Sequence, residues 1–167
     1  DELLTIHKEL VRRNGVDQGM VYLQMTRGAA DRDFAFDTDA MTPSLVLFTQ
    51  KKELLDTQVA TKGLKVITLE DKRWGRCDIK TTQLLYPSLA KMEAKKAGAD
   101  DAWLVCDGEI TEGSSNNAYI VTKDGAIVTR PLSHSILPGI TRATLMAYAE
   151  ETGTRIEERT FTVEEAR

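Results

Sequence analysis

The sequence is poor in cysteine and aromatic residues and has no long apolar run. Its two cysteines, Cys77 and Cys106, form no CxxC pair and have no pair of histidines beside them, so we expect neither a disulfide framework nor a metal site. No apolar stretch approaches the roughly 20 residues that a membrane-spanning helix needs, and no signal peptide opens the chain. From these absences we predict a protein of the reducing cytoplasm without a membrane partner.

Neither sign of charge dominates the chain. The 26 acidic and 22 basic residues are interleaved and give a formal net charge of −4. A nucleic-acid-binding protein needs a basic face, and the sequence offers none, so no nucleic-acid partner is expected. Phosphate-binding loops of the GxGxxG and Walker types are also missing. What is present, 41% hydrophobic and 29% charged residues, is typical of a globular protein with its own core.

The period of the hydrophobic pattern changes several times along the chain. A helical period at the start ends at Asn14-Gly15, while Asp107-Gly108 and Asp124-Gly125 are hairpin signals. Thr141 is predicted to be the N-cap of the last helix. The pattern predicts helices over residues 2–13, 83–97 and 142–151, and strands over residues 20–26, 43–50, 64–69, 102–106, 117–122, 126–130 and 155–161. Such a mixture of helices and hairpins indicates an α+β fold.

We expect two domains, residues 1–55 and 56–167, because a polar stretch that ends at Gly63 separates the two halves of the pattern. The chain begins at Asp1 without a methionine. It stops at Arg167, just after a pattern typical of the start of a helix. We therefore expect a fragment of a longer polypeptide.

One part of the sequence carries an ordered set of residue types at fixed spacing. It opens with Glu112 in the run Thr-Glu-Gly-Ser-Ser-Asn-Asn-Ala-Tyr (111–119) and continues with Ile127 and Thr129. An apolar–x–Gly–apolar–x–basic run follows over residues 137–142. These residues match the signature of class IV pyridoxal-phosphate aminotransferases, which have fold type IV, at every required position. The chain thus resembles that family.

The segment Arg-Trp-Gly-Arg-Cys-Asp-Ile-Lys (73–80) is similar to the one that carries the cofactor lysine in the D-alanine aminotransferase branch. On composition alone Lys80 would be an ordinary loop lysine. The resemblance implies that Lys80 holds pyridoxal 5′-phosphate as a Schiff base and, once substrate has released it, shuttles the α-proton. It also implies that the chain supplies the C-terminal part of a small α/β domain and a large cofactor-binding domain that is truncated at its C-terminal end.

The resemblance implies cofactor contacts for five further residues. Glu112 is expected to keep the pyridine nitrogen protonated, a pairing of opposite charges in a low-dielectric site. Ile140 and Thr141 are expected to bind the phosphate through backbone amides and the Thr hydroxyl. The local sequence agrees, since a helix that starts after Pro138-Gly139 offers free N–H groups to an anion. Arg73 is expected near Glu112 and the lysine, and Ser115 on the cofactor face.

Substrate contacts are implied for Ser114 and for Arg32. The run Arg-Gly-Ala-Ala-Asp-Arg-Asp-Phe (27–34) is similar to a loop that, in D-amino-acid aminotransferase, reaches across the dimer and holds the substrate α-carboxylate with an Arg and a His. Arg32 matches the Arg, and it can bind a carboxylate through two hydrogen bonds. Phe34 stands at the His position, which removes one donor and shifts the expected substrate toward a bulkier or less polar group.

The predicted function is therefore transamination between a D-amino acid, D-alanine first, and a 2-oxo acid, by a homodimer. Branched-chain aminotransferase and aminodeoxychorismate lyase of the same family are alternatives. An alternative of another class is an inactive scaffold. In the family a phosphate-binding arginine precedes the matched region and a last phosphate loop follows it.

Overall fold

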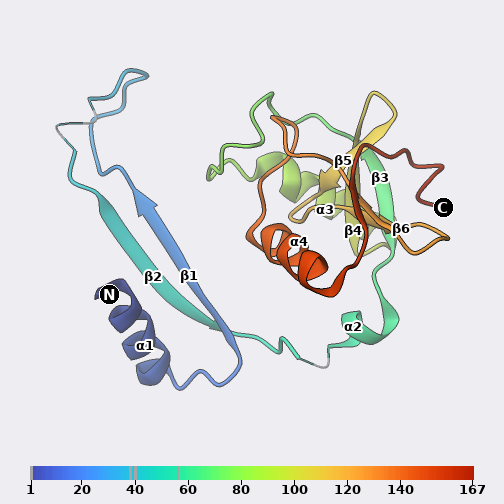
Figure 1. The fold of residues 1–167 in the computed structure, drawn as a ribbon. Coiled ribbons are helices and arrows are strands. Elements are labelled where there is room, and N and C mark those ends of the chain that lie inside the picture. The colour runs from blue at the N-terminus through green and yellow to red at the C-terminus, as the bar shows by residue number, and fades with distance from the viewer. Residues whose placement is uncertain (1, 38, 40, 56) are drawn as a thin grey trace. The chain divides into compact units, whose positions relative to one another are not determined.

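A computed structural model describes residues 2–37, 39, 41–55 and 57–167 (Figure 1). The chain divides into two compact units, Asp1–Gly63 and Leu64–Arg167. This division lies later in the chain than the domain boundary expected after residue 55, and Asp56 is outside the described residues. The assignment of the two parts to a small and a large domain stays a prediction. No helix in the described residues is long and apolar enough to cross a membrane.

The first unit contains a helix, a two-stranded sheet and a short second helix. The helix α1 (Glu2–Asn14) ends where Gly15 takes a φ of 56°, as the Asn-Gly signal predicts. The strand β1 (Gly19–Thr26) pairs antiparallel with β2 (Ser44–Lys51) along its whole length. The Tyr22 and Phe48 rings stack across this pair with their centroids 4.8 Å apart.

The short helix α2 (Gln58–Lys62) was not predicted. Thr57 caps it by accepting a hydrogen bond from the Ala60 N–H at 3.3 Å. The helix has five residues, which is too short for a helical period to register in the sequence.

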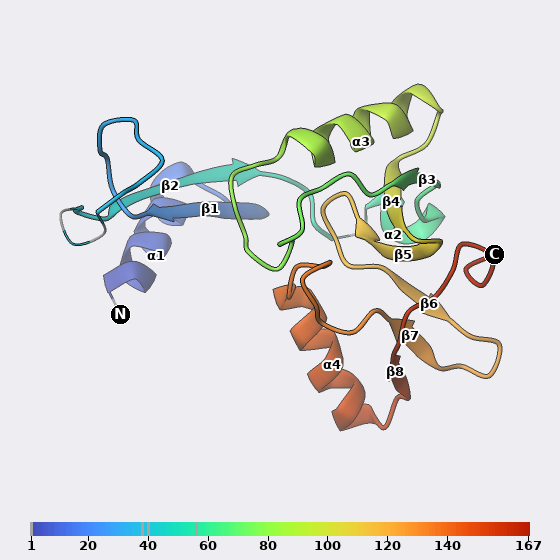
Figure 2. The same cartoon turned by 90° about the horizontal axis from the view of Figure 1, so that it is seen from above.

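The second unit is built on two three-stranded sheets (Figure 2). In one, β3 (Val66–Glu70) lies parallel to β4 (Asp101–Cys106), which forms a hairpin with β5 (Glu109–Gly113). In the other, β6 (Tyr119–Val121) pairs antiparallel with β7 (Ile127–Thr129), which lies parallel to β8 (Ile156–Glu158). The two expected Asp-Gly turns connect β4 to β5 and β6 to β7. The α+β prediction is confirmed.

Each sheet of the second unit has its own apolar cluster. The helix α3 (Leu85–Lys96) lies alongside β3 and β4 (Figure 2) and packs small buried side chains against them, among them Ala90, Ala94, Ala102 and Leu104. A second cluster joins Ile110, Ala118, Val128 and Phe161, and the Phe161 ring meets Trp103 edge to face. β5, where Glu112 lies, pairs with β4 on one side, and its Ile110 packs into the second cluster.

The last helix and the last strand differ from their predicted bounds. The helix α4 (Ile140–Thr152) starts earlier than residue 142, and the strand predicted over residues 155–161 is shortened to β8. Beyond β8 the backbone continues with an isolated bridge between Thr162 and Glu109. Apolar residues such as Phe161 extend the strand pattern in the sequence, but Phe161 fills the second core cluster outside a regular strand.

Candidate active site

The segment that carries Lys80 connects β3 to α3 and is anchored to residues 134 and 135. The Cys77 N–H donates to the His134 carbonyl at 2.8 Å, and Asp78 Oδ1 lies 3.2 Å from His134 Nδ1. Hydrogen bonds from Arg76, with the help of His134, hold the pKa of Asp78 well below its usual range. Lys80 is exposed, and within the described residues its ammonium makes no hydrogen bond or ion pair. An anchored loop thus presents a free amine.

Glu112 lies in β5 with only 5% of its surface exposed. Its Oε1 accepts a hydrogen bond from Arg73 Nη1, and its Oε2 accepts from Asn117 Nδ2 at 2.9 Å and from the Leu137 N–H at 3.2 Å. Burial raises the pKa of Glu112 above its ordinary value, and the hydrogen bond from Arg73 opposes that rise without cancelling it. Three donors from separate segments fix the carboxylate in place, while burial leaves it with a higher affinity for a proton than a carboxylate in water has.

Arg73 divides its hydrogen bonds between two carboxylates. Its Nε and Nη2 donate to Asp71 Oδ1 and Oδ2 at 2.9 and 2.7 Å, a two-pronged pairing. Its Nη1 donates to Glu112, and Nη2 also reaches the Ser135 carbonyl at 3.1 Å. The structure thus brings Arg73 and Glu112 together, as the resemblance implied. Sequence reasoning assigned no role to Asp71, although an Asp two residues before an Arg is a signal for such a local pair.

Asn117 joins Glu112 to the segment before α4. Its amide nitrogen donates to Glu112 Oε2 and to the Leu137 carbonyl, each at 2.9 Å. Its Oδ1 lies so close to Gly139 that an added β-carbon at Gly139 would be 2.4 Å from it. The signature includes Asn117 and Gly139, but sequence reasoning gave neither a contact. The close approach explains why the chain has a glycine immediately before this helix.

The N-terminus of α4 offers unpaired backbone donors. Gly139, with a ψ of 141°, is the N-cap, and the first intrahelical bond runs from the Ala143 N–H to the Gly139 carbonyl at 3.0 Å. The prediction that Thr141 is the N-cap is wrong, because the helix has already begun at Ile140. The N–H groups of Ile140 and Thr141 precede that first bond and have no partner within the described residues. Both residues are exposed, so an anion can reach these donors.

The two serines after Gly113 have different surroundings. Ser114 is buried, and its hydroxyl donates to Asp101, which also accepts from Asn116 Nδ2 at 3.0 Å. These bonds secure the turn that follows Glu112, so the Ser114 hydroxyl has a structural partner and its contact with substrate stays a prediction. Ser115 is exposed in the same turn and is open to a ligand.

Arg32 and Phe34 lie in the first unit, in the exposed connection between β1 and β2. The Arg32 guanidinium stands over the Phe34 ring at 5.6 Å, a cation–π contact. Phe34 is 92% exposed. The two side chains therefore interact with each other, and the substrate role of Arg32 stays a prediction.

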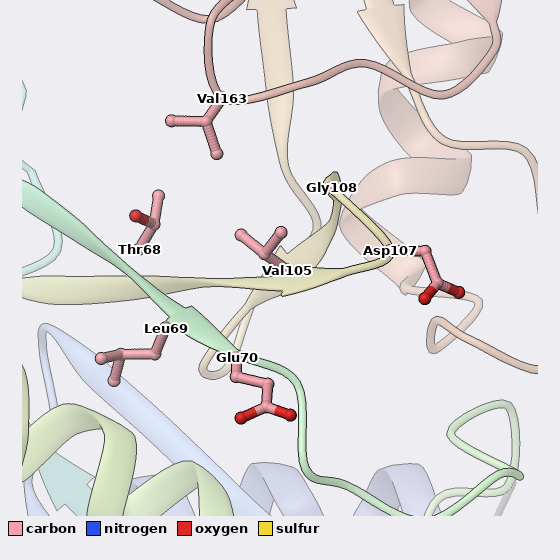
Figure 3. Close-up of a pocket in the computed structure, with 7 residues that line it drawn as sticks. All are labelled: Thr68, Leu69, Glu70, Val105, Asp107, Gly108 and Val163. Atoms are coloured by element: carbon pink, nitrogen blue, oxygen red, sulfur yellow. The ribbon is translucent and has the colours of Figure 1, made fainter.

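A surface pocket elsewhere in the second unit contains none of the predicted site residues (Figure 3). The residues labelled there come from β3, from the β4–β5 hairpin and from the segment after β8: Thr68, Leu69, Glu70, Val105, Asp107, Gly108 and Val163. The residues that line this pocket include no lysine, and neither Glu112 nor Arg73 is among them. The pocket is therefore not the candidate active site.

Together these residues make a donor set suited to an anionic, electron-withdrawing cofactor. Lys80 supplies an amine, Glu112 a buried carboxylate, and the α4 N-terminus two free N–H groups beside the exposed Thr141 hydroxyl. Residues 134–137 contact both the Lys80 segment and the Arg73–Glu112 pair, so one segment ties these parts together. The donors present, an amine, a buried carboxylate and free backbone N–H groups at a helix N-terminus, fit pyridoxal phosphate.

Comparison with known proteins gives the family. The whole chain, residues 1–167, matches the family described as amino-transferase class IV, and the chain belongs to it. It is 40% identical over 164 residues to a D-alanine aminotransferase of Staphylococcus aureus (strain MSSA476), an alignment that covers 98% of this chain. The chain spans 57% of the length of that relative.

Solved structures agree with the fold. The chain resembles the fold IV-transaminase CpuTA1 of Curtobacterium pusillum with a TM-score of 0.74 and 25% identity, over 93% of this chain and 52% of the other. It resembles the branched-chain aminotransferase of the thermophilic archaeon Thermoproteus uzoniensis, solved with norvaline, with a TM-score of 0.75 and 27% identity. That match covers 98% of this chain and 56% of the other. The fold type IV prediction is confirmed.

Proposed function

We propose that Lys80 is the attachment point of pyridoxal 5′-phosphate, and that the enzyme in which these residues occur transfers an amino group between a D-amino acid and a 2-oxo acid. The observation that carries the proposal is the buried Glu112 carboxylate, held by Arg73, Asn117 and the Leu137 N–H next to an anchored loop with a free amine. The 40% identity to a D-alanine aminotransferase supports D-alanine as the amino donor.

Pyridoxal phosphate, when bound, supplies the electron sink that stabilises a carbanion at the substrate α-carbon. In this proposal the chain supplies the amine, the carboxylate and a phosphate-binding helix N-terminus. Lys80 Nζ binds the cofactor and, when free, takes the α-proton and returns it, since an amine can act in turn as base and acid. Glu112 would accept a hydrogen bond from a protonated ring nitrogen, and the three donors that fix its carboxylate support this role.

The phosphate is assigned to the N-terminus of α4. Two free N–H groups and the positive end of a helix of 13 residues favour a dianion there. The Thr141 hydroxyl adds a donor at the same helix end, and Ser115 a further one in the turn after β5. Asn117 contacts both Glu112 and the residues that precede α4, which supports a fixed spacing between the proposed ring contact and the proposed phosphate contact.

For the substrate carboxylate we propose Arg32, with the protein acting as a homodimer. A guanidinium binds a carboxylate through two parallel hydrogen bonds. Phe34 offers an aromatic face in place of a hydrogen-bond donor, which favours a less polar substrate group beside Arg32 than a donor would. Ser114 is the further substrate contact in this proposal.

The test begins with cofactor binding by the 167-residue chain. Titration with pyridoxal phosphate should produce a near-ultraviolet to violet absorbance band, and borohydride should trap a covalent adduct that peptide mass spectrometry locates at Lys80. Lys80→Ala should abolish the adduct. Lys91→Ala, which alters an α3 lysine paired with Asp101, is the matched control and should retain it. An adduct spread over several lysines, or kept by Lys80→Ala, would overturn the assignment, and no adduct would favour the scaffold alternative.

The choice of branch is tested with the complete enzyme. Half-reactions with D-alanine, D-glutamate, L-alanine and L-leucine separate the candidates by rate. We expect D-alanine to be fastest. Faster turnover of L-leucine than of either D-amino acid would favour a branched-chain aminotransferase, and release of an elimination product from aminodeoxychorismate would favour the lyase.

A further inference from the structure

The buried charges around Glu112 do not balance. Asp71 and Glu112 are two carboxylates with side chains 8% and 7% exposed, and they share the single guanidinium of Arg73. The half-buried Cys77 thiol also interacts with all three, and because burial raises its pKa it adds no negative charge at pH 7. With both acids ionised, this cluster carries one uncompensated negative charge.

The hydrogen bonds of Arg73 show which of the two carboxylates is less fully paired with its positive charge. Asp71 receives the Nε and Nη2 donors of Arg73, the Arg73 N–H at 3.1 Å and the Thr111 hydroxyl at 2.7 Å. Glu112 receives a single guanidinium nitrogen, Nη1. Asp71 therefore occupies one whole edge of the guanidinium and takes the larger share of its charge.

Asp71 can hold this arrangement because it is itself fixed. Its N–H donates to the Val105 carbonyl at 2.7 Å, which continues the β3–β4 ladder by one residue, and Thr111 is the neighbour of Glu112 on β5. Burial is the largest single influence and acts to raise the pKa of Asp71, but hydrogen bonds from Arg73 and Thr111 outweigh it, so this pKa lies below its ordinary value. The pKa of Glu112 is shifted the other way, above its ordinary value, chiefly by burial.

We propose that Asp71 is a positioning residue that turns Arg73 away from full pairing with Glu112, and so leaves Glu112 with a negative charge for a cationic ligand atom. A Glu112 paired with Arg73 through both oxygens would be neutralised before any ligand arrived. A Glu112 that shares Arg73 with Asp71 keeps its affinity for a proton or for a protonated ring nitrogen. The ring nitrogen rests on the proposed function, whereas the division of Arg73 between the two acids does not.

The test is a titration of Glu112 in the cofactor-free chain. Carbon-13 NMR of the chain with labelled glutamate side chains, with Glu112 assigned by its loss in Glu112→Gln, gives the pKa directly. In Asp71→Asn, Arg73 is free to pair fully with Glu112, and we expect the pKa of Glu112 to fall by about one unit or more. Asp71→Glu, which keeps the charge, should restore most of the difference. Asp124→Asn removes a carboxylate from an exposed Asp–Arg pair and should leave Glu112 unchanged. An unchanged pKa in Asp71→Asn overturns the proposal.

A second measurement uses the unmutated chain, in case Asp71→Asn does not fold. The Nε–H of Arg73 donates to Asp71, so its NMR signal should exchange with water at least tenfold more slowly than that of Arg27, whose exposed guanidinium has only a ring contact in the described residues. Equal exchange rates would show that Asp71 does not hold Arg73. Cofactor titration forms a separate arm, in which Asp71→Asn should weaken pyridoxal phosphate binding about tenfold. If the unmutated chain binds no cofactor, the proposed function loses support while the two NMR measurements still decide the role of Asp71.

Discussion

Asn117 is the side chain whose loss most directly tests how the candidate site is held together. Its amide donates one hydrogen bond to the Glu112 carboxylate and one to the Leu137 carbonyl, each at 2.9 Å. A hydrogen bond to a charged group contributes about 1.5–3 kcal/mol and a neutral one about 0.5–1.5 kcal/mol. We expect Asn117→Ala to lower the free energy of unfolding by about 2–4 kcal/mol, since both bonds are lost and their acceptors are half-buried or buried.

A carboxyl at the same position makes the prediction depend on pH. In Asn117→Asp a second acid faces Glu112, and like charges raise the pKa of both groups. The folded variant then binds a proton at a pH at which the unfolded chain has released it, so its stability falls as pH rises through and above about 4. At lower pH the protonated new carboxyl can donate to Glu112, and the deficit relative to the unmutated chain should shrink.

The assay is urea unfolding of the chain, followed by circular dichroism at a series of pH values from about 4 to about 8, the range that spans the carboxyl pKa values. Asn117→Asp made in a Glu112→Gln background is the control, because the repulsion then has no partner. We expect the extra pH dependence to disappear in that background. A deficit that is independent of pH, or one that persists unchanged with Glu112→Gln, would refute the view that Asn117 acts through Glu112.

Two further predictions concern packing around the same residues. Gly139→Ala should cost about 1–3 kcal/mol, because the new β-carbon would lie 2.4 Å from Asn117 Oδ1, whereas Gly75→Ala, with no atom within 4 Å, should change urea unfolding little. Ser114→Ala should cost about 1–3 kcal/mol by removing a donor from buried Asp101, while Ser115→Ala at the exposed neighbour should stay within about 0.5 kcal/mol; equal losses in thermal unfolding would contradict the structural role of Ser114.

The elements that sequence reasoning predicted well are those with a strong local signal. Long periodic segments such as α1 and α3, and the hairpins at Asp107-Gly108 and Asp124-Gly125, follow from residues that are neighbours in the chain. The start of α4 was misplaced for the same local reason. Thr is a residue type that often caps helices. In the structure, however, Gly139 has the extended backbone of an N-cap and lies close to Asn117, so the helix begins two residues earlier than predicted.

The contacts of the candidate site were harder to predict, because they join segments far apart in the chain. The signature indicated which residue types matter, and Arg73 near Glu112 followed from the resemblance. The roles of Asp71 and Asn117 depend on β3 and β5 lying on either side of β4, and on the residues before α4 returning to Glu112. The spacing of residues in the sequence does not indicate which distant segments come into contact in the fold. For Ser114, the resemblance implied a substrate contact, while the fold supplied Asp101 as a hydrogen-bond partner.

The candidate site also contains several polar groups that lack a full set of hydrogen-bond or charge partners within the described residues. The Lys80 ammonium and the first N–H groups of α4 have no partner within the described residues, and Glu112 is buried with its charged form disfavoured. Of these, the buried Glu112 carboxylate costs stability until a ligand supplies a cationic partner, whereas water hydrates the exposed amine and N–H groups. Asn117 and the Leu137 N–H offset part of that cost by donating to Glu112, without pairing the amine or the helix N-terminus. On the proposed function, a ligand with a phosphate, a carbonyl carbon and a cationic ring nitrogen would supply a partner for each of these groups, and its binding should stabilise the folded chain by an amount that grows with the logarithm of its concentration over its dissociation constant.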